Sequence, residues 1–250
     1  MSTQQLIEQI RELRLPGFEQ ALSRMFETPD QMKLPFEDRL SLLLEAETLD
    51  RKQRKQQRLR KAAKIKQASA YVEDIDYAAN RGIDRGALET LCRCDWITRN
   101  QFLLITGPTG TGKSWLACAL GNEAIRLGHS VVYKRFGLMM EELDIARKDG
   151  SLPKLRSLLT RTNLLILDDW AMSPLSDMGR QDLLDIIEER TGEGAMVITS
   201  QLPVTQWHVY IDEPTTADAI MDRLIHRSHR LELSGESMRK KQSLSSVKQE

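Results

Sequence analysis

The chain has little cysteine, no long apolar run and no excess of either charge. Its three cysteines, Cys92, Cys94 and Cys118, lack the spacing of a disulfide framework or a zinc site, so we expect reduced thiols. No apolar run approaches the ~18 residues that a membrane-spanning helix needs, and the first residues, MSTQQLIEQIREL, carry charges where a signal peptide is apolar. We therefore expect a cytoplasmic protein with no membrane partner.

Aromatic residues are also scarce, at 5% of the 250 residues, and the sequence contains no zinc-finger or base-stacking motif. The 36 basic side chains are balanced by 36 acidic ones, so the formal charge is zero. Contacts with a nucleic acid would therefore come from local clusters of Lys and Arg on phosphates, and they would be largely independent of base sequence. The length allows one or two domains of ordinary size.

The charges are unevenly distributed over the first quarter of the chain. Residues 36–50 contain five acids and one base, whereas residues 51–66 contain nine bases and no acid. Apolar residues at helical spacing predict one helix from residue 35 to about 66, preceded by two shorter helices, one near residues 3–14 and one after Pro16–Gly17. We predict a helical N-terminal domain over residues 1–68 and a second domain over residues 69–250, in which residues 69–100 form a connector that is extended over residues 71–84.

The basic run predicts a contact with an external anion. On a helix, bases spaced three or four apart form one stripe, made of Arg51, Arg54, Lys55, Arg58 and Lys61 with Lys64 at its end. Like charges at this spacing oppose the helix by roughly 0.2 to 0.5 kcal/mol per pair, and duplex DNA offers about one phosphate charge per 1.7 Å of its axis. The alternative is a solvated helix, or one that packs against the acids of residues 36–50 in another subunit.

From about residue 100, short apolar runs alternate with longer amphipathic segments. The runs at residues 102–106, 130–134, 163–169, 195–200 and 229–233 are typical of buried strands, and the segments between them have helical spacing. This alternation predicts an α/β fold with a five-stranded, mainly parallel sheet covered by helices on both faces.

The first predicted strand is followed by GPTGTGKS, which matches the phosphate-loop pattern GxxxxGK[ST] and precedes a predicted helix over residues 114–127. Glycines allow backbone amides to wrap phosphates, and the helix N-terminus adds positive charge. Lys113 should reach the β- and γ-phosphates, and Ser114 should hold Mg²⁺. A glycine-rich turn before a helix is the alternative. The residues predicted to bind the nucleotide are Gly107, Pro108, Thr109, Gly110, Thr111, Gly112, Lys113 and Ser114.

Two further predicted strands end in polar residues that complement the loop. In NLLILDD, Asp168 should bind Mg²⁺ and Asp169 should polarise the attacking water, although two acids after a strand could instead cap a helix. The strand AMVITS is followed by Gln201, so Thr199, Ser200 and above all Gln201 are candidates to sense the γ-phosphate; the alternative is an ordinary transition from strand to loop.

The motifs GPTGTGKS, LLILDD, ITSQLP, ADAIMDRLIHRSHRLEL and GESMRK, behind a helical arm rich in Lys and Arg, resemble those of the IstB-like ATP-binding proteins. These are helper ATPases of insertion-sequence transposition, similar to the DnaC helicase loaders within the AAA+ class. The resemblance covers nearly the whole chain. It implies an AAA+ P-loop core behind a small all-helical N-terminal domain, and because the segment after GESMRK is short we expect no C-terminal helical lid.

The resemblance also implies a homo-oligomer with ATP sites shared between subunits. Arg223 lies at the family's arginine-finger position, and its alternative is a surface ion pair with an acid such as Asp218 or Asp222. Arg239 lies where the class often has a second sensor. A second basic patch, Lys148, Lys154, Arg156 and Arg161, falls where related proteins carry a DNA-facing insertion, which makes Lys154 and Arg156 further candidate DNA contacts.

The leading hypothesis is an ATP- and Mg²⁺-dependent ATPase that assembles on duplex DNA and assists a transposase. Asp169 and Gln201 replace the Glu and Asn that are usual in the class, so we expect slow basal hydrolysis that DNA and assembly stimulate. One rival is a DnaC-like helicase loader, which would prefer single-stranded DNA. The other is a small-molecule P-loop kinase, which would be a monomer without DNA dependence.

Overall fold

The computed structural model describes residues 3–77 and 81–238, and the chain divides into two compact units, residues 1–58 and 59–250. Helix α4 (Phe36–Ala63) begins in the first unit and ends in the second. Ala63 is buried in the core of the second unit, where Leu59 and Ile65 also pack, so the end of α4 belongs to that unit. The domain boundary at residue 68 stays a prediction.

The first unit is helical. It contains α1 (Thr3–Glu12), α2 (Pro16–Glu27), the short α3 (Pro29–Met32) and the first part of α4, and its core consists of Ile10, Leu22, Met25 and Leu43. The two short helices expected at its start are present, whereas α3 was not predicted. The long helix ends at Ala63, earlier than expected, because Lys64 adopts a left-handed backbone with φ of 50°. Lys64 therefore lies outside the helix that carries the basic stripe.

The second unit is built on a five-stranded parallel sheet in the order β2-β3-β4-β1-β5. The strands are β1 (Phe102–Thr106), β2 (Val131–Arg135), β3 (Leu164–Trp170), β4 (Ala195–Ser200) and β5 (Ser228–Glu232). All five predicted strands are confirmed to within about one residue; β1 to β4 contain buried apolar runs bounded by polar residues, whereas in β5 only Leu231 is buried.

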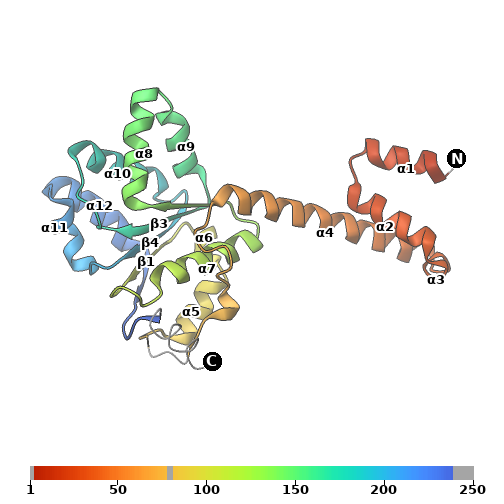
Figure 1. The fold of residues 1–250 in the computed structure, drawn as a ribbon, viewed down its shortest axis with the longest axis horizontal. Coiled ribbons are helices and arrows are strands. Elements are labelled where there is room, and N and C mark those ends of the chain that lie inside the picture. The colour runs from red at the N-terminus through yellow and green to blue at the C-terminus, as the bar shows by residue number, and fades with distance from the viewer. Residues whose placement is uncertain (1–2, 78–80, 239–250) are drawn as a thin grey trace, which may run out of the picture. The chain divides into compact units, whose positions relative to one another are not determined.

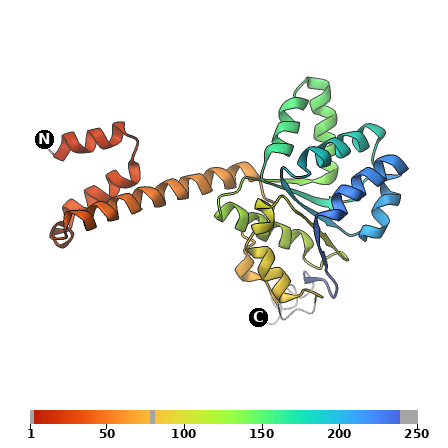
Figure 2. The same cartoon turned by 180° about the vertical axis from the view of Figure 1, so that it is seen from behind.

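Helices cover both faces of this sheet, as Figures 1 and 2 show. Residues such as Leu103 and Ile105 face α5 (Arg85–Cys92), α6 (Asp95–Thr98) and α7 (Lys113–Arg126). Their neighbours Phe102 and Leu104 face the other way, where five helices pack: α8 (Phe136–Asp149), α9 (Leu152–Arg161), α10 (Asp177–Arg190), α11 (Trp207–Ile211) and α12 (Pro214–His226). This alternation is the period of two expected of strands buried on both faces.

The connector over residues 69–100 contains short helices both within and after residues 71–84, the part predicted to be extended. It contains a 3-10 turn, η1 (Val72–Asp74), as well as α5 and α6. Asp84 caps α5 by accepting a hydrogen bond from the backbone N–H of Ala87 at 2.9 Å, and Leu88 and Trp96 are buried against the core. Helices this short give a weak periodic signal in the sequence, which is why they were missed.

After β5, the described chain continues to residue 238 without a further helix that could form a lid. Arg239, the candidate second sensor, lies outside the described residues. Within the described parts, no helix is both long enough and apolar enough to cross a membrane.

Candidate nucleotide-binding site

The loop between β1 and α7 has the strand–loop–helix order that its sequence predicts, and two of its glycines cannot be replaced without strain. Gly107 has φ of 144°, and a Cβ there would lie 2.1 Å from the carbonyl oxygen of Leu233. Gly110 has φ of 86°, and its Cβ would lie 2.3 Å from Ser237 Oγ. Only glycine combines these backbone angles with such close neighbours, so the loop keeps its backbone amides accessible at the start of α7.

Lys113, the first residue of α7, is buried and its side chain folds back onto the loop. Its Nζ donates hydrogen bonds to the carbonyl oxygens of Gly107 at 2.7 Å and Pro108 at 2.8 Å. The ammonium group is thereby held within the loop whose amides would surround an anion. This is the position that a phosphate-binding lysine requires.

Asp168 is fully buried and accepts hydrogen bonds from three hydroxyl groups. Ser114 Oγ donates to its Oδ1 at 2.7 Å, Thr199 Oγ1 donates to the same oxygen, and Tyr133 Oη donates to Oδ2 at 2.5 Å. The structure thus brings together Ser114 and Asp168, the two predicted metal ligands. Their oxygens are of the kind that hard divalent cations prefer, so these two residues could hold Mg²⁺. No cluster of three or more His, Cys, Asp or Glu elsewhere in the described chain could hold a metal.

Asp169 is oriented differently from its neighbour because the strand bulges at this point. The pairing of β3 with β4 shifts register between Leu167 and Trp170, and Asp169 has φ of 62°. Its backbone N–H donates to Thr199 Oγ1 at 3.2 Å, and its Oδ2 accepts from Arg135 Nε at 3.2 Å. The side chain borders the cavity beside the phosphate loop, where an attacking water would approach.

The three sensor candidates after β4 have different surroundings. Thr199 contacts both acids, whereas the buried Ser200 donates to the carbonyl oxygen of Trp170 at 3.1 Å. Gln201 accepts a hydrogen bond from Thr109 Oγ1 at 2.6 Å and borders the cavity. Gln201 and Thr199 therefore touch the site, and Ser200 does not contact either acid.

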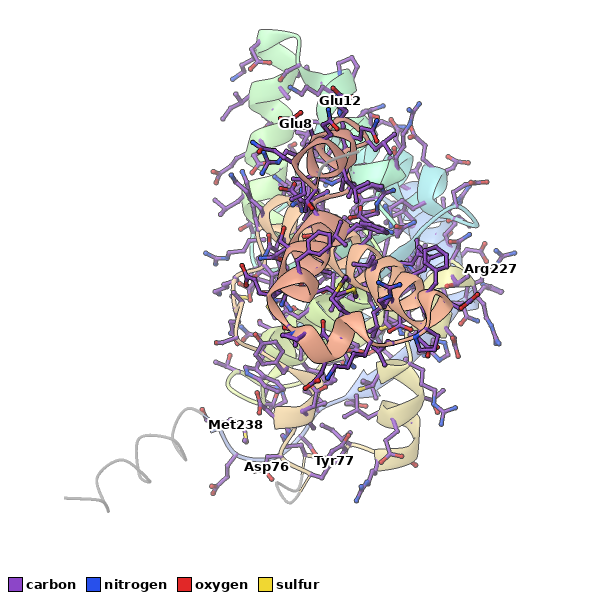
Figure 3. The ribbon with its side chains drawn as sticks, turned by 90° about the vertical axis from the view of Figure 1, so that its right-hand side faces the viewer. Glu8, Glu12, Asp76, Tyr77, Arg227 and Met238 are labelled. Atoms are coloured by element: carbon purple, nitrogen blue, oxygen red, sulfur yellow. The ribbon has the colours of Figure 1, made fainter. Side chains whose placement is uncertain are left out.

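The loop and Asp169 border a cavity of about 650 Å³, which is large enough for a nucleotide. Its other walls are formed by Gln67, Asp74, Asp76, Arg81, Trp115 and Met238. Figure 3 labels Asp76 and Met238, which come from the connector and from the segment after β5. Met238 donates its backbone N–H to the carbonyl oxygen of Gly110 at 2.9 Å, so that segment lies directly on the loop.

Sequence reasoning missed three side chains at this site: Tyr133, Arg135 and Arg81. Arg81 is 5% exposed and donates to the carbonyl oxygen of Asp76 at 2.8 Å, and its sequence neighbours give no signal of this role. Tyr133 and Arg135 lie at the end of β2, next to the acids of β3, so strand alternation and order could have suggested them. Burial, and next the hydrogen bond to Asp168, raise the pKa of Tyr133 well above its usual value, so its hydroxyl stays a donor.

Arg223 lies on α12, outside the residues that border the cavity. It donates to the carbonyl oxygen of Ala219 at 2.9 Å and forms an ion pair with Glu188 of α10 at 2.8 Å. The alternative expected for Arg223, an ion pair with a surface acid, is therefore present, but its partner is Glu188, since Asp218 pairs with His208 and Asp222 with His226. The sequence could not identify Glu188, since it does not show that α10 packs on α12.

The candidate DNA contacts differ in how much of their charge is already paired. Arg156 contacts Asp182 at 2.7 Å and Asp185 at 2.8 Å, whereas Lys154 on the same helix is exposed. Arg51 and Arg54 pair with Glu47 and Asp50, one helical turn earlier. In the described chain, the exposed bases Lys55, Arg58 and Lys61 form no ion pair.

The fold and site together define the class of this protein. A phosphate loop between β1 and α7, a buried acid on β3, which β4 separates from β1, and an all-parallel sheet are the parts of a P-loop ATPase of the AAA+ class. A family model described as IstB-like ATP binding protein matches residues 8–246. The chain therefore belongs to the IstB-like ATP-binding protein family, as its motifs indicated.

Individual proteins show the same similarity. An insertion sequence ATP-binding protein of Sinorhizobium fredii is 44% identical over 236 residues, which cover 94% of this chain and 96% of that protein. The crystal structure of DnaI matches with a TM-score of 0.58 and 19% identity, over 67% of this chain and 92% of that one. The DnaC helicase loader matches with a TM-score of 0.56 and 18% identity, over 68% and 99%. At these low identities, the two structures establish the shared AAA+ fold alone.

Proposed function

We propose that this chain is a cytoplasmic, Mg²⁺-dependent ATPase that assembles on duplex DNA as a homo-oligomer and helps a transposase by delivering target DNA. The observation that carries the ATPase part is the contact of Ser114 with the buried Asp168, beside a loop that already holds Lys113. The insertion-sequence names of the relatives support the role in transposition.

In this proposal, the loop residues 107–114 bind the phosphates through backbone amides, and Lys113 adds a positive charge beside the β- and γ-phosphates. Ser114 and Asp168 hold the cation, which neutralises phosphate charge when bound. Both residues offer oxygen atoms, which hard cations prefer. The Asp168 carboxylate forms no ion pair in the described chain, where its partners are three hydroxyl groups, so its negative charge can go to a cation.

Hydrolysis is assigned to groups that border the cavity and to one that comes from a neighbouring subunit. Asp169 borders the cavity and polarises the attacking water, and Gln201, held by Thr109, orients it. Arg223 is 28% exposed and is proposed to reach the γ-phosphate bound by the adjacent copy, after exchanging Glu188 for that phosphate. Such a site hydrolyses ATP slowly until a second copy completes it.

DNA binding is assigned chiefly to the basic stripe of α4. Lys55, Arg58 and Lys61 are exposed and form no ion pair in the described chain, so their charges can bind phosphates. Arg51 and Arg54 already pair with Glu47 and Asp50. Lys154 and Arg156 remain candidate contacts on α9, with Arg156 the weaker because two carboxylates already occupy its guanidinium group.

The substitution Lys113→Ala tests the ATP part of the proposal. We expect it to abolish nucleotide binding and ATP-driven assembly together, because it removes the only side-chain charge held within the described loop. Fluorescent-nucleotide titration and light scattering with ATP would measure both effects. Lys33→Ala, at an exposed lysine of the first unit, is the matched control. Assembly that survives Lys113→Ala unchanged would remove ATP from the assembly step.

The preference of the protein for duplex or single-stranded DNA distinguishes a transposition helper from a helicase loader. Duplex and single-stranded DNA of equal length are compared at matched salt, with particle images of the ATP-bound protein on each. We expect tighter binding to the duplex. Preference for the single strand would favour the loader, whereas a monomer that transfers phosphate to a small molecule would indicate a kinase.

A further inference from the structure

Strand β2 contributes a side chain to the acid of β3 that no motif of the chain identifies. Tyr133 pairs in register with Ile166 of β3, so both residues point to the sheet face that α7 covers. Asp168 and Thr199 follow the same alternation on β3 and β4. The phenol, the carboxylate and the threonine hydroxyl therefore meet directly below Ser114, at the first turn of α7.

We propose that Tyr133 is a positioning residue for the divalent cation that accompanies ATP, acting by fixing one carboxylate oxygen of Asp168. This inference rests on the proposed Mg²⁺-dependent function. The phenol donates to Oδ2 at 2.5 Å, while Oδ1 accepts from Ser114 and Thr199. Rotation of the carboxylate would break all three hydrogen bonds, so the oxygen beside Ser114 is held ready for the cation or for its bound water.

The hydroxyl group of Tyr133 is not needed for packing. Its ring belongs to the apolar cluster around α7, where a phenylalanine ring would fill the same space. Tyr133 is only 8% exposed, so water cannot readily replace its hydrogen bond to Asp168. A short hydrogen bond from a neutral hydroxyl to a carboxylate is strong and directional, and partners of this kind commonly tune metal ligands.

The substitution Tyr133→Phe removes this hydroxyl and keeps the ring. ATP binding is measured across a Mg²⁺ titration and in EDTA, and Mn²⁺ binding to the ATP complex is measured by electron paramagnetic resonance. We expect the cation concentration at half-effect to rise about tenfold, in the range found for partners of metal ligands. ATP affinity in EDTA should stay the same, because the loop and Lys113 are untouched.

Tyr210→Phe provides a matched control. The Tyr210 hydroxyl is also an internal donor, to the carbonyl oxygen of Ser173 at 2.6 Å, but Tyr210 does not border the nucleotide cavity. Its removal should leave the Mg²⁺ titration unchanged. Adding Tyr133→Phe to Asp168→Asn should cause little further shift, because the phenol acts through that carboxylate. Even if Tyr133→Phe lowers the melting temperature, the comparison of Asp168→Asn with the double variant shows whether the phenol acts through Asp168.

The outcomes separate this inference from the function on which it rests. If wild-type protein gains ATP affinity with Mg²⁺ and Tyr133→Phe gains it at the same concentration, the positioning role is wrong and the proposed function stands. If wild-type protein binds and hydrolyses ATP equally well in EDTA, the Mg²⁺ dependence is wrong and the positioning role fails with it.

Discussion

Asp168 and Asp169 are adjacent in the sequence and have different surroundings in the fold. Asp168 is fully buried and fixed by three hydroxyl donors, whereas Asp169, turned by the bulge, borders the cavity and pairs with the partly exposed Arg135. An ion pair this accessible holds its partners only weakly, by roughly 0 to 1 kcal/mol. Asp169 can therefore exchange Arg135 for a water molecule, while Asp168 stays in place.

Asp169→Asn should uncouple binding from hydrolysis. The amide keeps the size of the side chain and loses its ability to polarise water, so we expect phosphate release to fall by roughly 10² to 10⁴-fold. Nucleotide affinity and ATP-driven assembly should persist, since the loop and Asp168 are unchanged. Phosphate-release and nucleotide-binding assays would measure the two effects, with Asp144→Asn on the exposed side of α8 as a control. If Asp169→Asn keeps the wild-type rate of ATP hydrolysis, another group polarises the attacking water.

At the scale of residues, the sequence could predict what lies close along the chain or at the same edge of the parallel sheet. Lys113, Ser114 and Asp168 were predicted as one site because the loop and the acidic strand both end at the same edge of the sheet. The bond from Tyr133 to Asp168 and the pair of Arg223 with Glu188 depend on strand order and helix packing. The packing of α12 on α10 leaves no periodic trace in a single sequence, and the alternation that places Tyr133 on the face of Asp168 does not by itself show that β2 lies beside β3.

At the scale of elements, α4 carries two kinds of base that the sequence alone treats as one stripe. Acids one turn earlier neutralise Arg51 and Arg54, whereas Lys55, Arg58 and Lys61 follow too far from those acids to be paired. Residues 51–66 contain no acid, but the acids just before them pair with Arg51 and Arg54, so the number of unpaired positive charges is smaller than the sequence suggests.

This difference gives a sharp test of the stripe. Replacing Lys55, Arg58 and Lys61 by Gln should weaken duplex binding and reduce the salt slope by about 2.7, at ~0.9 per lost phosphate contact. Replacing Arg51 and Arg54 by Gln should change the slope less, because intrahelical acids compete for those charges. Binding isotherms at several salt concentrations would measure both slopes. If all variants have the same salt slope as the wild-type protein, the basic stripe does not contact DNA phosphates, and α4 is a solvated helix.

The elements themselves were predictable in proportion to their length and periodicity. Strands β1 to β4 were predicted because each contains a buried run between polar boundaries, and α7 because it follows the phosphate loop; β5, in which only Leu231 is buried, gave a weaker signal. Helices α5 and α6 were missed because their packing against the core, through Leu88 and Trp96, fixes segments too short to be recognised by pattern.

At the scale of the whole molecule, the proposed site needs two copies of the chain. Mixing Asp169→Asn with Arg223→Ala tests this, because each variant lacks one half of the site and supplies the other. Both should be inactive alone. An equal mixture should recover about a quarter of wild-type turnover, the share of interfaces in random head-to-tail assembly that unite the two intact halves. No recovery, or full activity of Arg223→Ala alone, would place the finger elsewhere.

The chain has four tryptophans, and one of them is more exposed to solvent than the other three. Trp96, Trp170 and Trp207 are at most 3% exposed, whereas Trp115 is partly exposed and borders the nucleotide cavity. A water-soluble quencher such as acrylamide would therefore dim mainly Trp115. The protein thus carries its own optical reporter of site occupancy, which needs no attached dye and no altered residue.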